Sequence, residues 1–157
     1  MRGFGSCRVI LPAIVLVLAL GANSFGEHHA KEAKQLPSVT HSRLLQGTTD
    51  GPDWLMYGGN YEGWRYSPHS DITRENVESL QAAWIFQTGV PAQMQASPLV
   101  ADGVMYVTAA YNKLYALDAG TGKPLWKYDH ELPDDMRICC GPGNRGAALA
   151  GDKVIMA

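Results

Sequence analysis

Two adjacent cysteines, Cys139 and Cys140, stand in a glycine- and proline-rich loop that also carries Arg145. The Cα atoms of neighbouring residues are about 3.8 Å apart, which is closer than in ordinary disulfides. A bond between the two sulfur atoms would therefore close a small, strained ring that is flat and rigid. Two reduced thiols, or bonds to cysteines outside this sequence, are the alternatives that the residues leave open. The zero spacing excludes the C-x-x-C motif of dithiol exchange.

The N-terminal residues predict export and so indicate the redox environment of the cysteine pair. Two arginines and an apolar stretch, Val9–Leu20, are followed by small residues, which is typical of a signal peptide over residues 1–24. The stretch is short for a transmembrane helix, which needs about 20 apolar residues, although a retained anchor is the alternative. Cleavage would remove Cys7 and leave the loop cysteines in an oxidising compartment. We therefore expect a periplasmic protein without a stable membrane span.

The composition limits the size of the domain and the classes of partner. The chain has 157 residues, a hydrophobic fraction of 46% and a formal net charge of -2. This is at most one ordinary domain, and its charge gives no reason to expect a nucleic-acid partner. The 17 glycines and the scarce helical periodicity favour short strands joined by tight turns. Residues 25–50 are polar and without period, which predicts a disordered tail, and His28 and His29 fit such a tail better than a metal site.

The region after Ser97 predicts one blade-sized unit of four short antiparallel strands. Asp102 and Gly103 predict the first hairpin turn, because glycine accepts the positive φ that such turns require. An earlier strand and a short helical turn are also expected. The predicted strands span residues 83–89, 98–100, 104–108, 113–118 and 124–128, and the helical turn spans 76–80.

This unit repeats along the chain. Pro98–Val107 returns in looser form as Ala147–Met156, an offset of 49 positions (147 minus 98). Trp84–Phe86 likewise resembles Trp126–Tyr128, an offset of 42 (126 minus 84). Stacked repeats bury their faces against neighbours and end in modified caps, and no cap is visible here. We therefore expect residues 51–157 to form the N-terminal blades of a longer β-propeller that is truncated in this sequence.

The turn between the last two strands of the unit, Ala116–Trp126, carries a tryptophan-docking pattern. Asp118 can accept hydrogen bonds from the N–H groups of the turn. Gly122 permits a left-handed φ and leaves room for a ring above the peptide plane. Trp126 is expected to stack on an adjoining blade while its N–H bonds to a carbonyl. The pattern predicts stability rather than catalysis.

Together these motifs resemble the quinoprotein alcohol dehydrogenases that depend on pyrroloquinoline quinone (PQQ). The resemblance covers about residues 53–157. It is carried by Trp54–Asn60, Arg65–Pro68, Ala83–Trp84 with Gln87–Gly89, Asp102–Thr108, the docking turn, and Cys139–Pro142 with Asn144–Gly146. It implies an all-β fold, an eight-bladed β-propeller with the quinone near its axis. It also implies oxidation of an alcohol to an aldehyde or ketone, with PQQ accepting the hydride and a divalent cation, usually calcium, polarising the quinone carbonyl.

By the same resemblance, four residues of this chain face the cofactor. Cys139 and Cys140 form a vicinal disulfide that packs flat on one face of PQQ. Arg145 lies near the polar groups of the quinone, and its planar fork suits carboxylate and quinone oxygens; a surface or blade-linking arginine is the alternative. Gln95 stands where many relatives have a glutamate, so it can form hydrogen bonds but carries no charge to pair with Arg145.

The catalytic base and the calcium ligands are expected outside this chain. Asp134 and Asp135 match no ligand position of the family and are interpreted as solvated loop charges. The implied partners are a small alcohol and a c-type cytochrome that accepts electrons. One alternative is a non-catalytic periplasmic β-propeller scaffold of outer-membrane assembly type, which has no reason to keep adjacent cysteines beside an arginine. Another is a PQQ sugar dehydrogenase, whose membrane relatives carry several transmembrane helices and lack the cysteine pair.

Overall fold

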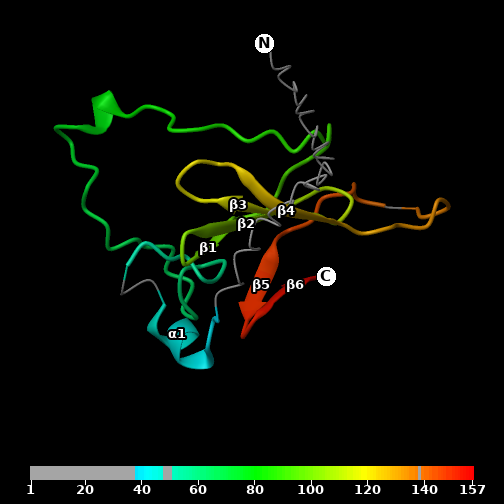
Figure 1. The fold of residues 1–157 in the computed structure, drawn as a ribbon, viewed down its shortest axis with the longest axis horizontal. Helices are drawn as coiled ribbons and strands as arrows, with labels where there is room; N and C mark the ends of the chain where they lie inside the picture. Colours follow the sequence, from blue (N-terminus) through cyan, green and yellow to red (C-terminus); the bar gives the residue numbers. More distant parts are fainter. Residues whose placement is uncertain (1–37, 48–50, 138) are drawn as a thin grey trace, which may run out of the picture. The chain divides into compact units, whose positions relative to one another are not determined.

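The computed structural model describes residues 38–47, 51–137 and 139–157, and Figure 1 shows their arrangement. The predicted signal peptide (1–24) and residues 25–37 of the predicted tail lie outside the described residues. Among the helices of the described ranges, none is long and apolar enough to cross a membrane.

Four consecutive strands form one antiparallel sheet with the strand order β1-β2-β3-β4. The strands are β1 (Leu99–Ala101), β2 (Val104–Ala109), β3 (Lys113–Asp118) and β4 (Pro124–Asp129). Asp102 and Gly103 connect β1 and β2 with φ values of 47° and 76°. This confirms both the predicted blade-sized unit and its first turn, because a two-residue hairpin with two positive φ values matches the twist of the flanking strands.

The repeat predicted near the end of the sequence is a second antiparallel hairpin. It consists of β5 (Ala147–Ala150) and β6 (Lys153–Met156), which form a sheet of their own. Leu149 is buried in the same apolar cluster as Leu99 and Tyr106 of the first sheet, and Val154 and Met156 pack against that cluster. The hairpin therefore covers part of one face of the first sheet.

Both faces of the two central strands, β2 and β3, are buried. Leu114 and Ala116 of β3 belong to the cluster shared with β5 and β6, whereas Tyr115 and Leu117 belong to a second cluster with Trp84 and Phe86. Successive side chains of a strand point to opposite faces, so a strand covered on both sides is apolar almost throughout. This explains the continuous apolar pattern of β2 and β3.

The docking turn forms as predicted, and the ring that occupies it is that of Trp84. The N–H and hydroxyl of Thr121 donate to Asp118 Oδ1, each at 2.9 Å. Gly122 has a φ of 68°, and a Cβ added to it would lie 2.4 Å from Cε3 of Trp84. Trp84 Nε1 donates to the Ala119 carbonyl at 3.1 Å. The docked ring therefore comes from the segment before the sheet, because docking joins one unit to the next.

Trp126, which we predicted to stack on an adjoining blade, packs within its own sheet in this structure. Its ring lies 6.0 Å, between centroids, from that of Tyr106. The two residues belong to strands on either side of β3, and Ala116 between them leaves room for the larger rings. The turn of its own sheet holds Trp84 instead.

Residues 83–89, predicted as a strand, have no ladder partner among the described residues. The segment contacts the sheet through side chains. Phe86 lies edge-on to Tyr115, with ring centroids 5.2 Å apart. Tyr115 also donates through its hydroxyl to the Thr88 carbonyl at 2.9 Å. An apolar run rich in β-branched and aromatic residues predicts a strand. It does not specify the hydrogen-bonded neighbour that a strand needs. The predicted helical turn is confirmed as the 3₁₀ helix Val77–Ser79.

The predicted tail over residues 25–50 is wrong for residues 38–47, which are ordered. They include α1 (His41–Gln46), whose cap Thr40 accepts a hydrogen bond from the N–H of Arg43 at 3.3 Å. Val39 is 2% exposed and forms a β-bridge with Gly151, the turn of the β5–β6 hairpin. This segment is therefore ordered by contacts with distant residues, which its own polar sequence does not reveal.

Candidate cofactor-facing loop

The adjacent cysteines lie in the loop that leads from the first sheet to β5. The Sγ atoms of Cys139 and Cys140 are 2.8 Å apart, and both side chains are exposed thiols. A sulfur–sulfur bond measures about 2.05 Å, so the two sulfur atoms are close neighbours that are not joined in this structure. The vicinal disulfide stays a prediction.

Arg145 acts electrostatically on Cys140. The pKa of the Cys140 thiol is raised chiefly by its hydrogen bond with Cys139, and burial adds to the increase. The positive charge of Arg145 opposes this shift, because it stabilises a thiolate. The structure thus places the Arg145 charge within electrostatic range of Cys140, five positions away in the same loop.

Gln95 reaches the same loop from the segment before β1. A Cβ added to Gly143 would lie 3.1 Å from Gln95 Oε1, so this amide rests against the loop backbone where no side chain intervenes. Gln95 Nε2 donates to Gln93 Oε1 at 3.3 Å, and Gln93 Oε1 would lie 3.6 Å from a Cβ on Gly141. Residues 48 positions apart (143 minus 95) therefore meet at one surface.

Sequence reasoning missed two participants in this loop, Gln93 and Asn144. Gln93 lies two positions before Gln95, a spacing that places two side chains on one face of an extended segment. Asn144 was noted only as part of a motif, although it is 6% exposed and fully hydrogen-bonded. The only sequence signal for Asn144 is a polar residue between Gly143 and Arg145. This signal does not predict that the side chain is buried.

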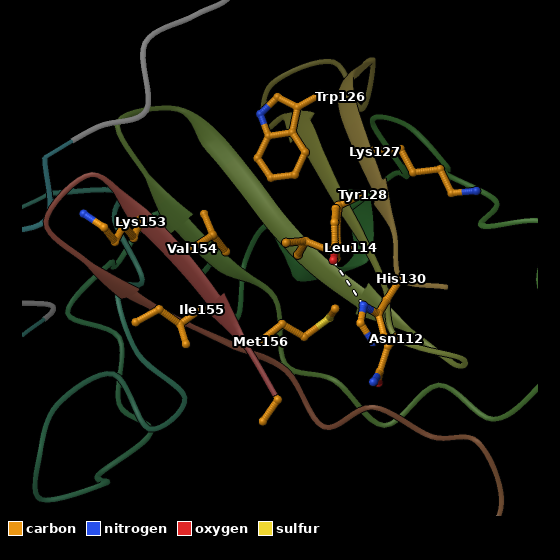
Figure 2. A pocket seen from close by; sticks show the side chains of 11 residues that line it. Asn112, Leu114, Trp126, Lys127, Tyr128, His130, Lys153, Val154, Ile155 and Met156 are labelled. Carbon is orange, nitrogen blue, oxygen red and sulfur yellow. Dashed lines mark hydrogen bonds between the residues drawn. The ribbon is translucent and has the colours of Figure 1, made fainter. Parts of the chain in front are cut away.

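A mostly apolar groove lies elsewhere on the described residues. It measures about 750 Å³ and runs between β3–β4 and β6. Leu114, Trp126, Val154 and Met156 line it (Figure 2). None of the four predicted cofactor-facing residues lines this groove. It is an uncovered sheet face rather than a place for chemistry, and residues 38–47, 51–137 and 139–157 contain no cluster of three metal-ligating side chains.

Comparison with known proteins connects this arrangement to a family. Residues 54–154 match the family described as "PQQ: Glucose/ethanol/alcohol dehydrogenase, beta-propeller domain". The chain belongs to this family. The match covers the sheet, the cysteine loop and most of the β5–β6 hairpin, so it rests on the same residues as the geometry described above. The all-β propeller fold and the resemblance noted in the sequence are confirmed.

Curated relatives of this quinoprotein chain are alcohol dehydrogenases. A quinoprotein ethanol dehydrogenase of Pseudomonas aeruginosa is 41% identical over 152 residues, which are 96% of this chain and 23% of that protein. A 1-butanol dehydrogenase (quinone) of Thauera butanivorans is 48% identical over 124 residues, 78% of this chain and 20% of that protein. The chain therefore spans about a fifth to a quarter of the length of these relatives.

Solved structures show the same likeness in three dimensions. The quinohemoprotein alcohol dehydrogenase of Comamonas testosteroni superposes with a TM-score of 0.70 at 33% identity, covering 79% of this chain and 19% of that one. A europium-containing methanol dehydrogenase gives a TM-score of 0.67 at 34% identity, covering 73% of this chain and 21% of that one.

The loop residues fit the group that this family binds. PQQ is a planar quinone with carboxylate groups, so it requires a flat contact surface and donors for anionic oxygens. The sulfur pair of Cys139 and Cys140 supplies polarisable atoms on an exposed surface. Arg145 supplies a planar cationic fork, and the amide of Gln95 supplies a neutral donor. These residues would make one wall of a cofactor site.

Proposed function

We propose that the full-length protein carrying this chain is an exported, periplasmic PQQ-dependent dehydrogenase that oxidises alcohols to aldehydes or ketones. The observation that carries the proposal is the convergence of Cys139, Cys140, Arg145 and Gln95 at one loop in a chain of the quinoprotein family. The names of the relatives, an ethanol and a 1-butanol dehydrogenase, support small alcohols as substrates.

Each of the four residues has a distinct task in this proposal. Cys139 and Cys140, joined as a vicinal disulfide in the oxidising periplasm, give a flat and rigid surface for one face of the cofactor. Arg145 binds and orients its anionic oxygens through a charge-assisted fork. Gln95 forms hydrogen bonds without a charge, so it does not neutralise Arg145. PQQ, when bound, supplies the carbon centre that accepts the hydride equivalent of the alcohol.

Calcium and a c-type cytochrome complete the proposed system. A divalent cation would supply Lewis-acid polarisation to the bound quinone, and we propose that its ligands and the catalytic base belong to parts of the protein outside this chain. The family relationship and the quinone chemistry support this acceptor, because a quinone reduced by two electrons must be reoxidised after each turnover, here by two one-electron transfers to the cytochrome.

The experiment measures alcohol-dependent dye reduction by the purified full-length protein after removal and return of PQQ and calcium. We expect activity only with both, and a loss of about 10- to 100-fold when Cys139→Ser and Cys140→Ser are combined, because a displaced cofactor reacts from the wrong geometry. Asp134→Asn is the matched control in the preceding loop and should leave activity unchanged. Cell fractionation of the same strain tests the periplasmic location.

Two results would contradict this function. Unchanged activity in the double cysteine variant would remove the role of the sulfur pair. Absence of PQQ binding by the wild-type apoprotein would exclude the dehydrogenase altogether. If envelope proteins instead co-purify with a protein that shows no quinone absorbance, the scaffold alternative holds.

A further inference from the structure

We propose that Asn144, acting through Asn112, is the positioning residue that holds the cofactor-facing side chains of the cysteine loop. This inference rests on the proposed function and names a residue to which that function gave no task. Asn144 lies between the sulfur pair and Arg145 in the sequence. It is buried, whereas Cys139, Cys140 and Arg145 are exposed.

Every polar atom of the Asn144 side chain is used in holding the loop. Its Nδ2 donates to Asn112 Oδ1 at 2.9 Å and to the Ala157 carbonyl at 3.0 Å. Its Oδ1 accepts from the N–H of Gly146 at 3.0 Å. A buried amide with satisfied hydrogen bonds stabilises one arrangement, because any displacement leaves polar atoms unpaired. Asn144 thus fixes the backbone on both sides of Arg145.

A second hydrogen bond secures the loop on the cysteine side of Asn144. The N–H of Tyr111 donates to the Pro142 carbonyl at 2.9 Å. Pro142 follows Cys140 by two positions, so the loop is held at Pro142 and Asn144 while the residues assigned to the cofactor project from it. Both attachments lead to the same turn, the one between β2 and β3.

The turn that receives these bonds is a rigid support. Tyr111 and Asn112 have φ values of 59° and 51°, a left-handed conformation that asparagine tolerates better than most residues. β2 and β3 on either side are paired along their whole length. A site whose side chains are positioned from a paired hairpin is held more tightly than one on a free loop.

The consequence for the cofactor follows from geometry. If the hydrogen bond between Asn144 and Asn112 is lost, the side chains of the sulfur pair and Arg145 are unchanged. Their relative position is then no longer fixed. A displacement of about 1 Å in such a site can cost about 100-fold in function. Asn144 is assigned no contact with the cofactor itself, so its effect is indirect and should show in PQQ affinity.

The experiment compares variants of the full-length apoprotein titrated with PQQ and followed by absorbance. Asn112→Gly removes the accepting oxygen and retains the left-handed φ, and Asn144→Asp replaces the donor with a carboxylate oxygen facing two acceptors. We expect each to raise the Kd for PQQ by about tenfold or more, and the double variant to be no worse than the stronger single one. Asn112→Asp retains the accepting oxygen, so its PQQ affinity should stay close to the wild-type value, unlike that of Asn112→Gly.

A measurement without PQQ tests the attachment of the cysteine loop to the β2–β3 turn separately from cofactor binding. Hydrogen exchange of the Tyr111 amide, whose partner is the Pro142 carbonyl, should become faster in Asn112→Gly. Tyr111→Asn is the matched control: it changes the same turn but keeps this N–H and the side chain of Asn112. Its PQQ affinity should match that of the wild type, with a similar melting temperature.

The outcomes separate this inference from the proposed function. A PQQ Kd within about twofold of the wild type in both single variants, accompanied by a lower melting temperature, would show a merely structural role and overturn the inference. Unchanged Tyr111 exchange in Asn112→Gly would also overturn it. If the wild-type protein binds no PQQ, the proposed function fails and the cofactor part of this inference fails with it. Faster exchange of the Tyr111 amide in Asn112→Gly would then still support the role of Asn112 in attaching the loop to the β2–β3 turn.

Discussion

The side chains assigned to the cofactor differ in exposure from the residues that hold them. Cys139, Cys140, Arg145 and Gln95 are exposed, whereas Asn144 is 6% exposed. An exposed cation beside an exposed sulfur pair gives little binding by itself, because water screens its charge. The proposed site therefore depends on further protein closing over the cofactor and excluding water from these residues.

At one residue, Gly122, the structure leaves no room for a side chain. A Cβ there would lie 2.4 Å from the Trp84 ring, at a φ of 68°. We expect Gly122→Ala to lower the free energy of unfolding by about 2–4 kcal/mol, from the strained backbone and the displaced indole. Gly120→Ala is the matched control in the same turn, because its Cβ would meet only Asp118 Oδ1 at 3.6 Å. Urea unfolding followed by tryptophan fluorescence measures both, and equal effects would contradict the docking role of Trp84.

At the scale of elements, the described residues 38–47 and 51–55 contact both hairpin systems. Val39 exchanges two backbone hydrogen bonds with Gly151, at 2.8 and 2.9 Å. Trp54 does the same with Val100 of β1, also at 2.8 and 2.9 Å. Two β-bridges from one segment to two different sheets restrict how the sheets can move relative to each other.

Arg43 of α1 secures this connection with two carboxylates. It contacts Asp53 at 2.6 Å and Asp102 at 3.0 Å, with 29% of its side chain exposed. The hydrogen bond with Asp102 is the largest of the effects that raise the pKa of Arg43, so it stays charged over the whole working pH range. We expect Arg43→Ala to lower the free energy of unfolding by about 1–2 kcal/mol, because partial exposure screens these contacts.

Lys153→Ala is the matched control for Arg43. Lys153 pairs with Asp152, but these side chains are 72% and 75% exposed, so its loss should change stability by less than about 0.5 kcal/mol. Urea unfolding at low and high salt measures both variants. A stability of Arg43→Ala equal to that of Lys153→Ala would show that α1 is not secured by its ion pairs.

The elements that sequence reasoning predicted well are those whose signals are local. The strands from Leu99 to Asp129 were found because hairpin turns and apolar runs lie next to each other in the chain. The segment over residues 83–89 was misassigned because its ladder partner is not specified locally. α1 was missed because six residues carry too little helical pattern. The tryptophan that docks on the Ala116–Trp126 turn comes from another unit, Trp84. The local sequence of the turn does not specify which unit that is.

The same distinction applies to the candidate site. Adjacent cysteines and a nearby arginine are visible in the sequence, and in the structure Arg145 lies within electrostatic range of Cys140. Gln95 was placed only through a family resemblance, because nothing in its local sequence predicts contact with Gly143. The bond between Asn144 and Asn112 spans 32 positions and could not be predicted, since two asparagines have many equivalent partners.

At the scale of the molecule, the sheets expose apolar surface that a propeller would cover. The groove of about 750 Å³ between β3–β4 and β6 includes Trp126, Val154 and Met156 (Figure 2). Each blade of a propeller packs its faces against neighbouring blades. Exposed apolar patches of this kind mark contacts with other protein, and this chain spans only 23% and 20% of two relatives.

This uncovered groove predicts how the 157-residue chain differs from the full-length protein. We expect the chain alone to bind the apolar dye ANS and to self-associate in size-exclusion chromatography, and the full-length protein to do neither. Met156→Lys places a charge in the groove and should lower dye fluorescence by roughly half or more. Ile85→Lys is the matched control, because Ile85 is 81% exposed and does not line the groove. Equal dye binding by the chain and the full-length protein would mean that these strands do not form a contact between blades.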